Sequence, residues 1–314
     1  MRAVQFTEYG PPAVVHVAEV EEPHAGSGTV RVAVRATGLS PGETLIRSGR
    51  LRDLVPMVLP YRTGFDAAGV VDEIGAGVTG VRVGDEVFGM ATVTARGANA
   101  EFAVLAEWAP KPEAWSWEEA GGAAGSVETG TRVLDRLGVG AGDRVLVHGA
   151  AGGVGAVAVQ LAIARGATVI GTASESNHDF LRSLGAEPTT YGPGLPGRVR
   201  ALGGVDTVFD CAGGALPDLL EITGDPARVV TIADFEAGAH GVHMSHGAPA
   251  DETGDAVGSA ADPLAVHGLR IAVELAGQGL LHVPVAATYP LEEAAAAHEL
   301  SETRHARGKI VLVP

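Results

Sequence analysis

The stretch Arg144-Val-Leu-Val-His-Gly149-Ala-Ala-Gly152-Gly-Val-Gly155 continues as Ala156-Val-Ala-Val-Gln-Leu-Ala-Ile-Ala-Arg165. A short apolar run, a glycine-dense turn and a long run of small residues predict the first strand–turn–helix unit of a dinucleotide-binding fold. Without side chains at Gly149, Gly152 and Gly155, the backbone can turn sharply and a pyrophosphate can approach the start of the helix. Backbone amides and the helix dipole face the anion there.

The context of this motif matters, because the chain has 45 glycines and some fall at any chosen spacing. A second apolar run at 167–172 follows the helix, as a β–α–β unit requires. The alternative interpretation is a glycine-rich turn that binds no ligand. We expect a dinucleotide to be bound by Gly149, Ala151, Gly152, Gly153, Val154 and Gly155.

The bulk composition limits the class of protein. The 314 residues are enough for two domains, each with its own core. The formal charge of −16 disfavours nucleic acid and anionic membranes as partners. No apolar run is long enough to span a membrane, and the first residues alternate like a strand rather than an export signal, so we expect a cytoplasmic protein. The single cysteine, Cys211, excludes an intramolecular disulfide and a multi-cysteine zinc site.

The first part of the chain, residues 1–120, is predicted to be rich in β-structure. Turn signals, including one at 83–89, separate short alternating runs, which is typical of a barrel or sandwich. The runs lie at 3–6, 14–17, 29–35, 68–74 and 101–105. Small residues and a helical pattern begin near 117–125, and we place the domain boundary there.

In the second part, residues 121–261, strands alternate with helices. This order predicts a doubly wound α/β domain with a parallel sheet. After the glycine motif, strands are expected at 168–171, 205–210 and 228–233, and helices at 178–185 and 217–222. The strand at 229–232 is expected at an edge of the sheet, and 237–260 is expected to be a loop with one embedded strand.

The closing part, residues 262–314, does not extend the parallel sheet in an obvious way. It is expected to contain a helix at 263–276, a strand at 283–290, a helix at 291–300 and a strand at 309–313. We interpret it as a return to the first domain.

Motifs along the whole chain resemble the zinc-free quinone oxidoreductases of the medium-chain dehydrogenase/reductase superfamily. They are Gly38-Leu-Ser-Pro-Gly-Glu43, Ile46-Arg-Ser-Gly49, Gly64-Phe-Asp-Ala-Ala-Gly-Val-Val71, Gly84-Asp-Glu-Val-Phe-Gly89, the glycine motif, Phe209-Asp-Cys-Ala-Gly213 and Gly308-Lys-Ile-Val-Leu312. The resemblance implies a GroES-like β-barrel catalytic domain at 1–120, completed by 262–314. It also implies an NADP-binding Rossmann domain at 121–261 and a homodimer formed through that domain.

Zinc-dependent relatives place a cysteine within 38–43 and a Gly-His-Glu triplet where this chain has Gly64-Phe65-Asp66. Ser40 and Phe65 stand at the ligand positions and supply neither thiolate nor imidazole, so we expect no metal. Without a Lewis acid, a hydride can go to a substrate that is already electron-poor. A quinone or an α,β-unsaturated carbonyl is such a substrate, and positioning of cofactor and substrate then supplies most of the rate.

The cofactor is expected to be NADPH. The end of the second strand carries hydroxyls rather than the acid that binds an NAD ribose, although Glu175 is close by. The resemblance implies that Tyr191 lies near the adenosine phosphate. The predicted set for the adenosine half is Thr172, Ser174, Asn177 and Tyr191, with His178 or Arg182 as further members. The alternative for the polar residues at the helix start is an ordinary N-cap.

Around the nicotinamide, the resemblance implies Ser40, Glu43, the backbone of Gly213 and residues of Thr231-Ile-Ala233. The cofactor-binding residues named here are Ala212, Gly213, Ile232 and Ala233. Family members commonly have asparagine at position 40, aspartate at 43 and threonine at 128. Glu128 is either a proton donor with a pKa raised by burial or an ordinary first-turn glutamate. Tyr61 is either a hydrogen-bond donor to substrate or a core or interface tyrosine.

Three function hypotheses follow. The first is an NADPH-dependent reductase of quinones or enones, the second a pathway-specific enoyl reductase of specialised metabolism, and the third an NADP-binding protein with little redox activity. His240, His243 and His246 lack a carboxylate or cysteine partner at ligand spacing and are interpreted as loop residues.

Overall fold

The computed structural model describes residues 1–52, 58–91, 97–248 and 261–314. The chain divides into two compact units. The first combines Met1–Gly125 with Leu269–Pro314, and the second is Ser126–Gly268.

The first unit is built on a six-stranded sheet in the order β16-β17-β3-β5-β6-β7, in which β3 also pairs with β7. Its strands are β3 (Val30–Leu39), β5 (Asp66–Ile74), β6 (Glu86–Ala91), β7 (Phe102–Pro110), β16 (Val285–Pro290) and β17 (Lys309–Val313). The pairing of β3 with both β5 and β7 closes four antiparallel strands into a ring. Buried valines and leucines, among them Val32, Val71 and Leu105, fill this ring.

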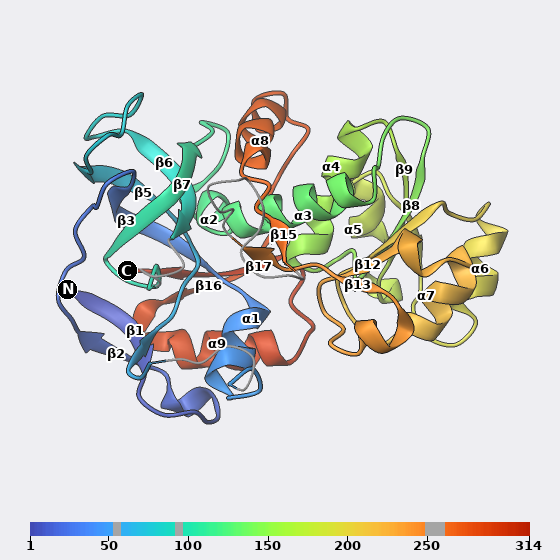
Figure 1. The fold of residues 1–314 in the computed structure, drawn as a ribbon, viewed down its shortest axis with the longest axis horizontal. Helices are drawn as coiled ribbons and strands as arrows, with labels where there is room; N and C mark the ends of the chain where they lie inside the picture. The colour runs from blue at the N-terminus through green and yellow to red at the C-terminus, as the bar shows by residue number, and fades with distance from the viewer. Residues whose placement is uncertain (53–57, 92–96, 249–260) are drawn as a thin grey trace. The chain divides into compact units, whose positions relative to one another are not determined.

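The C-terminal strands of the chain join this sheet. The last strand, β17, pairs with the second half of β3, so that Ile310 lies opposite Leu39. In Figure 1 the red strands β16 and β17 therefore continue the sheet that the blue and teal strands begin. A three-stranded sheet in the order β2-β1-β4 adds β1 (Arg2–Phe6), β2 (His16–Glu19) and β4 (Tyr61–Arg62). The helices here are α1 (Pro41–Arg47), α2 (Trp117–Gly121) and α9 (Ala294–Glu302), with α8 (His267–Gly277) starting at the end of the second unit.

The second unit contains a six-stranded sheet in the order β10-β9-β8-β11-β12-β13, and every neighbouring pair is parallel. Its strands are β8 (Arg144–His148), β9 (Thr168–Thr172), β10 (Glu187–Thr189), β11 (Thr207–Asp210), β12 (Val229–Thr231) and β13 (His243–Met244). In chain order this is 3-2-1-4-5-6, the doubly wound dinucleotide-binding order, whose ligands bind at the carboxyl ends of the strands where the order reverses. The reversal lies between β8 and β11.

Helices pack on this sheet through two apolar clusters. Leu146 and Val208 pack with α6 (Leu195–Ala201) and α7 (Leu216–Thr223). Phe209 and Val230 pack with residues of α3 (Ala124–Arg136) and α4 (Gly153–Ala164). Successive residues of β11 thus face different clusters, as the alternation of a strand requires. The remaining helix is α5 (His178–Ser183), and two short strands, β14 (Gly247–Ala248) and β15 (Asp262–Pro263), form a separate two-stranded parallel sheet.

The expected fold class is confirmed, with several local corrections. The segment 83–89, predicted as a turn, contributes Glu86 to Gly89 to β6. Strand β12 is not the sheet edge, because β13 pairs with it. The described part of 237–260 holds two short strands, and residues 249–260 lie outside the described residues. The helix expected from 263 begins at His267, since Asp262 and Pro263 form β15.

Candidate functional site

The predicted glycine turn joins β8 to the start of α4. Gly152 is the N-cap of this helix, no side chain caps it, and its first turn holds no acidic residue. Gly149 has a φ of 82°, in the left-handed region that favours glycine. A Cβ at Gly155 would overlap the carbonyl oxygen of Gly149, so this position must also be glycine. An uncapped helix start without acids fits a pyrophosphate.

A buried side-chain pair holds this turn. The hydroxyl oxygen of Thr172 lies 2.9 Å from the amide nitrogen of Gly149, which donates to it, and 2.8 Å from Nδ1 of His148. Burial lowers the pKa of His148, against the opposing effect of the Asp210 carboxylate. The neutral form of the His148 imidazole is therefore favoured, and this form adds no positive charge to the turn that is expected to bind the phosphates. The sequence predicts Thr172 as a cofactor-binding residue, which stays a prediction, and does not single out His148, whose only signal is its place at a strand end.

The polar residues predicted for the adenosine half lie at the carboxyl ends of neighbouring strands. Thr189 of β10 is paired with Thr172 of β9, so the segments after these strands start side by side. Within the first, Asn177 Nδ2 donates to Ser174 Oγ at 3.2 Å. Within the second, Tyr191 is 53% exposed.

The segment around Tyr191 also carries a cation that sequence reasoning did not single out. The guanidinium of Arg198 donates to the backbone carbonyls of Thr190, Tyr191, Gly192 and Pro193. These four carbonyl groups are uncharged, so none of these hydrogen bonds pairs the positive charge of Arg198 with an acidic group. Glu175, by contrast, is exposed beside Ser174.

The loops predicted for the nicotinamide follow β11 and β12. The amides of Ala212 and Gly213 donate to Asp210 Oδ1 at 3.0 and 2.9 Å. The amide of Ala233, next to Ile232, donates to Thr231 Oγ1 at 3.1 Å. Asp210 and Thr231 are both fully buried, and sequence reasoning assigned no role to Asp210.

In the first unit, Glu43 is the centre of a buried polar cluster. Glu43 Oε1 accepts the amide of Ser40 at 2.9 Å, and Oε2 accepts Asn99 Nδ2 at 2.8 Å. Asn99 is in turn bonded to the hydroxyls of Thr37 and Thr63. Burial raises the pKa of Glu43 to about 7, although the Ser40 amide, Lys309 and Asn99 favour the charged form. The structure therefore brings Ser40 and Glu43 together, with Asn99 as a member that the sequence did not reveal.

Tyr61 is 9% exposed and packs in an apolar cluster of the same unit. It belongs to β4, and its ring centroid is 5.3 Å from that of Phe6 on β1. The surrounding cluster also contains Ile46 and Leu59. Tyr61 is therefore packed as a core residue. Its contact with substrate stays a prediction.

Glu128, in the second unit, is buried in the second turn of α3 and not in the first turn of a helix as the simpler alternative assumed. Its carboxylate accepts Arg132 Nε at 2.8 Å and the amide of Ala265 at 3.1 Å. Arg132 also donates to Ser245, whose hydroxyl donates to Asp262 Oδ2 at 2.5 Å. Asp262 further contacts His243 and Arg136. Glu128 is therefore the ion-pair partner of Arg132. Proton donation by Glu128 stays a prediction.

Within the described ranges, no group of three or more His, Cys, Asp or Glu side chains is arranged to hold a metal ion. Burial, with the charge of Asp210, raises the pKa of the Cys211 thiol well above its ordinary value, which disfavours the thiolate form at neutral pH. No helix in the part of the chain that the structure describes is long and apolar enough to cross a membrane.

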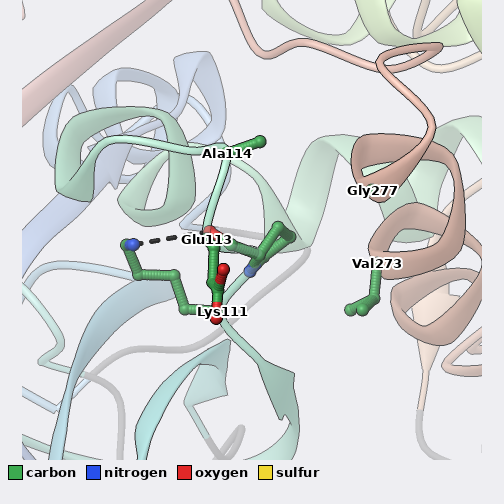
Figure 2. A pocket seen from close by; sticks show the side chains of 6 residues that line it. Lys111, Glu113, Ala114, Val273 and Gly277 are labelled. Atoms are coloured by element: carbon green, nitrogen blue, oxygen red, sulfur yellow. Dashed lines mark hydrogen bonds between the residues drawn. The ribbon is translucent and has the colours of Figure 1, made fainter.

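A shallow pocket of about 480 Å³ lies in the first unit. Figure 2 shows Lys111, Glu113 and Ala114 on one side of it and Val273 and Gly277 of α8 on the other. The Lys111 ammonium is engaged by the Pro112 carbonyl at 3.4 Å and by Glu86 at 3.6 Å. None of the predicted site residues lines this pocket.

Comparison with known proteins gives two family matches. Residues 26–175 match the alcohol dehydrogenase GroES-like domain, and residues 194–312 match the zinc-binding dehydrogenase family. The quinone oxidoreductase of Rattus norvegicus is 38% identical over 191 residues, which are 59% of this chain and 57% of the rat protein. The chain thus matches little more than half of that relative's length.

Two similarities extend over the whole chain. The quinone oxidoreductase of Sus scrofa is 30% identical over 337 aligned positions, covering 100% of this chain and 98% of the pig protein. The solved structure of the quinone oxidoreductase from Coxiella burnetii superposes with a TM-score of 0.82 at 29% identity, covering 100% of this chain and 99% of the other. These matches agree with the closed antiparallel ring, the doubly wound sheet and the glycine turn between β8 and α4. They show that the chain belongs to the medium-chain dehydrogenase/reductase superfamily, in the group of the quinone oxidoreductases.

Proposed function

We propose that this chain is an NADPH-dependent oxidoreductase that transfers a hydride to a quinone or an α,β-unsaturated carbonyl compound without a metal ion. The observation that carries the proposal is the uncapped, acid-free start of α4 behind the left-handed turn at Gly149. Such a helix start is suited to the pyrophosphate of a dinucleotide. The group of relatives to which the chain belongs supports the redox chemistry, since the pig and rat proteins are both named quinone oxidoreductase.

The preference for NADPH over NADH is part of the proposal. Support comes from the hydroxyl of Ser174, the amide of Asn177 and the exposed Tyr191 at neighbouring strand ends, with the cation of Arg198 bound to the Tyr191 segment. An extra phosphate needs such donors and positive charge. Glu175 opposes it as an exposed acid beside Ser174. Affinities for the two cofactors, measured by calorimetry, test this preference, and equal values would refute it.

The proposed reaction divides the work between cofactor and protein. When bound, the nicotinamide supplies the hydride, and conjugation lets the substrate spread the resulting negative charge onto a distant oxygen. Ala212, Gly213, Ile232 and Ala233 are proposed to border the nicotinamide, and Ser40 and Glu43 are proposed to act on the substrate. Glu43 holds a proton on its carboxyl group up to about pH 7 because it is buried. It can therefore donate the proton that the anion formed by hydride transfer takes up, and it becomes a carboxylate in that step.

The proposal is tested by following NADPH absorbance with a panel of quinones and enones. Turnover of several quinones and simple enones supports a general reductase. Turnover of a single enoyl substrate would instead indicate a pathway-specific enoyl reductase. Tight NADPH binding with no turnover on any member would replace the proposal with the third hypothesis, a nucleotide-binding protein with little redox activity.

We also propose that the protein is a homodimer formed along β13. In the order of the described strands, β13 ends the parallel sheet and pairs only with β12. Exposed edge strands invite pairing with another chain. Light scattering during size-exclusion chromatography gives the mass, and a monomer at micromolar concentration would contradict this proposal.

A further inference from the structure

The two loops that follow β11 and β12 are joined by hydrogen bonds from side chains to backbone. Asp210 ends β11 and lies opposite Thr231, which ends β12. The Thr231 hydroxyl donates to Asp210 Oδ2 at 2.7 Å, and the same oxygen atom of Thr231 accepts the amides of Ala233 and Asp234 at 3.1 Å each. Asp210 Oδ1 accepts the amides of Ala212 and Gly213. One carboxylate thus organises both loops.

A second carboxylate, that of Asp234 in the loop after β12, also binds the loop after β11. Asp234 Oδ2 accepts the amide of Gly214 at 2.9 Å, and its Oδ1 accepts the amide of Glu236 at 3.0 Å. The loops also approach each other closely, since a Cβ at Gly213 would lie 2.9 Å from the carbonyl oxygen of Ala233. Gly213 has a φ of 73°, so its loop turns in the left-handed region. Neither loop can shift without breaking contacts to the other.

These contacts define what each side chain must supply. Asp210 receives three hydrogen bonds and donates none, which suits an ionised carboxylate and does not suit an amide. Thr231 must donate once and accept twice, which a hydroxyl can do and a methyl group cannot. Both side chains are fully buried, so water cannot replace a lost partner without rearrangement.

We propose that Asp210 and Thr231 are positioning residues for the nicotinamide half of the bound dinucleotide. This inference rests on the proposed function, in which Ala212, Gly213, Ile232 and Ala233 border the nicotinamide. Asp210 and Thr231 do not touch the cofactor. They act by holding the two loops in one conformation, because they bind the amides of Ala212, Gly213, Ala233 and Asp234.

The test compares a whole cofactor with one that lacks the nicotinamide. Calorimetric affinities for NADPH and for 2′-phospho-ADP-ribose are measured for the wild type, Asp210→Asn, Thr231→Val and Thr231→Ser, with melting temperatures recorded in parallel. Asp143→Asn is the matched control, because Asp143 also accepts a backbone amide, that of Gly140, but precedes β8 at the opposite end of the sheet.

We expect Asp210→Asn and Thr231→Val to weaken NADPH binding about tenfold, the effect of losing one or more buried hydrogen bonds. Their affinity for 2′-phospho-ADP-ribose should stay within about twofold of wild type, and so should both affinities of Thr231→Ser and Asp143→Asn. A general loss of structure would weaken both ligands equally and would overturn the inference. If Asp210→Asn does not fold, the comparison of Thr231→Val with Thr231→Ser decides.

Failure of the inference and failure of the proposed function are distinguishable. If the wild type binds neither ligand, the proposed function is wrong. If the wild type binds NADPH and reduces a quinone or enone, but Asp210→Asn and Thr231→Val bind NADPH equally well, only the positioning role is wrong.

Discussion

The hydroxyl oxygen of Thr172 accepts the amide of Gly149 at 2.9 Å, so a side chain at the end of β9 holds the turn that follows the neighbouring strand β8. Thr172 is fully buried, and its other partner is His148. The turn that is proposed to receive the pyrophosphate is therefore fixed by a residue 23 positions away in the sequence.

Thr172→Val should remove this contact while keeping the shape of the side chain. The amide of Gly149 then loses its partner in the protein, which costs about 1–3 kcal/mol of unfolding free energy. NADPH affinity should fall with it, because the turn is no longer held. Urea unfolding and calorimetric titration measure the two effects. Thr172→Ser, which keeps the hydroxyl, should behave like the wild type, and equal losses in both variants would contradict this explanation.

Gly152→Ala should separate ligand binding from folding. A Cβ at Gly152 would lie 3.4 Å from the Gly149 carbonyl oxygen, an ordinary contact, whereas a Cβ at Gly155 would overlap that oxygen. Gly152→Ala should therefore change the unfolding free energy by less than about 1 kcal/mol. It should still weaken NADPH binding about tenfold or more by blocking close approach of the phosphates.

Gly155→Ala serves as the comparison, because it should lower both stability and affinity. If Gly152→Ala binds NADPH as tightly as the wild type, the pyrophosphate does not lie against the start of α4.

How far the sequence predicts this structure depends on where the partners of each residue lie. The glycine motif, the alternating strands and the last strand are visible because their signals are local. The turn predicted at 83–89 is present at Val83 and Gly84, but Glu86 to Gly89 belong to β6, and Gly89 resembles a turn residue in the sequence alone. In the structure Gly89 belongs to the strand, where a Cβ would overlap the carbonyl oxygen of Glu107 on β7. That reason for glycine becomes visible only when both strands are placed.

The site residues that the sequence did not reveal have distant partners. Asn99 contacts Glu43 across 56 positions, and Asp210 contacts Thr231 across 21. The pKa of Glu43 depends on burial among such partners, which no spacing rule gives. Helix α1, by contrast, carried a readable signal, since Ser40, Pro41 and Glu43 stand at its N-cap, first and third positions.

Glu43→Gln should change how stability depends on pH. Burial raises the pKa of Glu43 from 4.5 to about 7, so the folded state retains a proton that the unfolded state loses. Its favourable contribution is complete below about pH 4.5 and is lost as the pH rises to about 7. Replacement by an amide should remove this slope, which is at most about 1.4 kcal/mol per pH unit.

Urea unfolding of the Glu43→Gln variant between pH 5 and about 8 measures the change, with the exposed Glu8→Gln as control. If Glu43→Gln shows the same pH dependence as the wild type, Glu43 is not protonated in the folded protein near neutral pH.

His298 should act in the opposite direction. It is fully buried on α9, and among the described residues neither of its ring nitrogens has a hydrogen-bond partner. Burial, assisted by the charge of Arg47, lowers its pKa from 6.5 to about 4. The folded state therefore keeps a neutral imidazole, and stability present above about pH 6.5 is lost as the pH falls towards 4.

His298→Leu should reduce this acid sensitivity. At pH 5 it should gain roughly 1–2 kcal/mol of unfolding free energy relative to the wild type, compared with the difference at pH 8. The exposed His305→Leu should show no such change. An unchanged pH profile of His298→Leu would mean that this imidazole titrates normally.

Glu128→Gln tests the two roles considered for this residue. Loss of its charge leaves the buried Arg132 without its anionic partner, so we expect a decrease in unfolding free energy of roughly 3 kcal/mol. Proton donation by Glu128 would in addition lower turnover at saturating substrate. Unchanged turnover across pH would remove it from the catalytic site. The exposed Glu187→Gln in the same unit is the control.

The measurement that tests the central proposal most directly is isotope transfer from the cofactor to an enone. NADPH is prepared with deuterium at either the R or the S position of nicotinamide C4, and each form is incubated with the protein and an α,β-unsaturated ketone. We predict that one of the two forms delivers a single deuterium to the carbon β to the carbonyl group, as mass spectrometry and NMR of the product would show. Tight binding of NADPH with no deuterium in the product from either form, and no reduction of quinones, would contradict the proposed function.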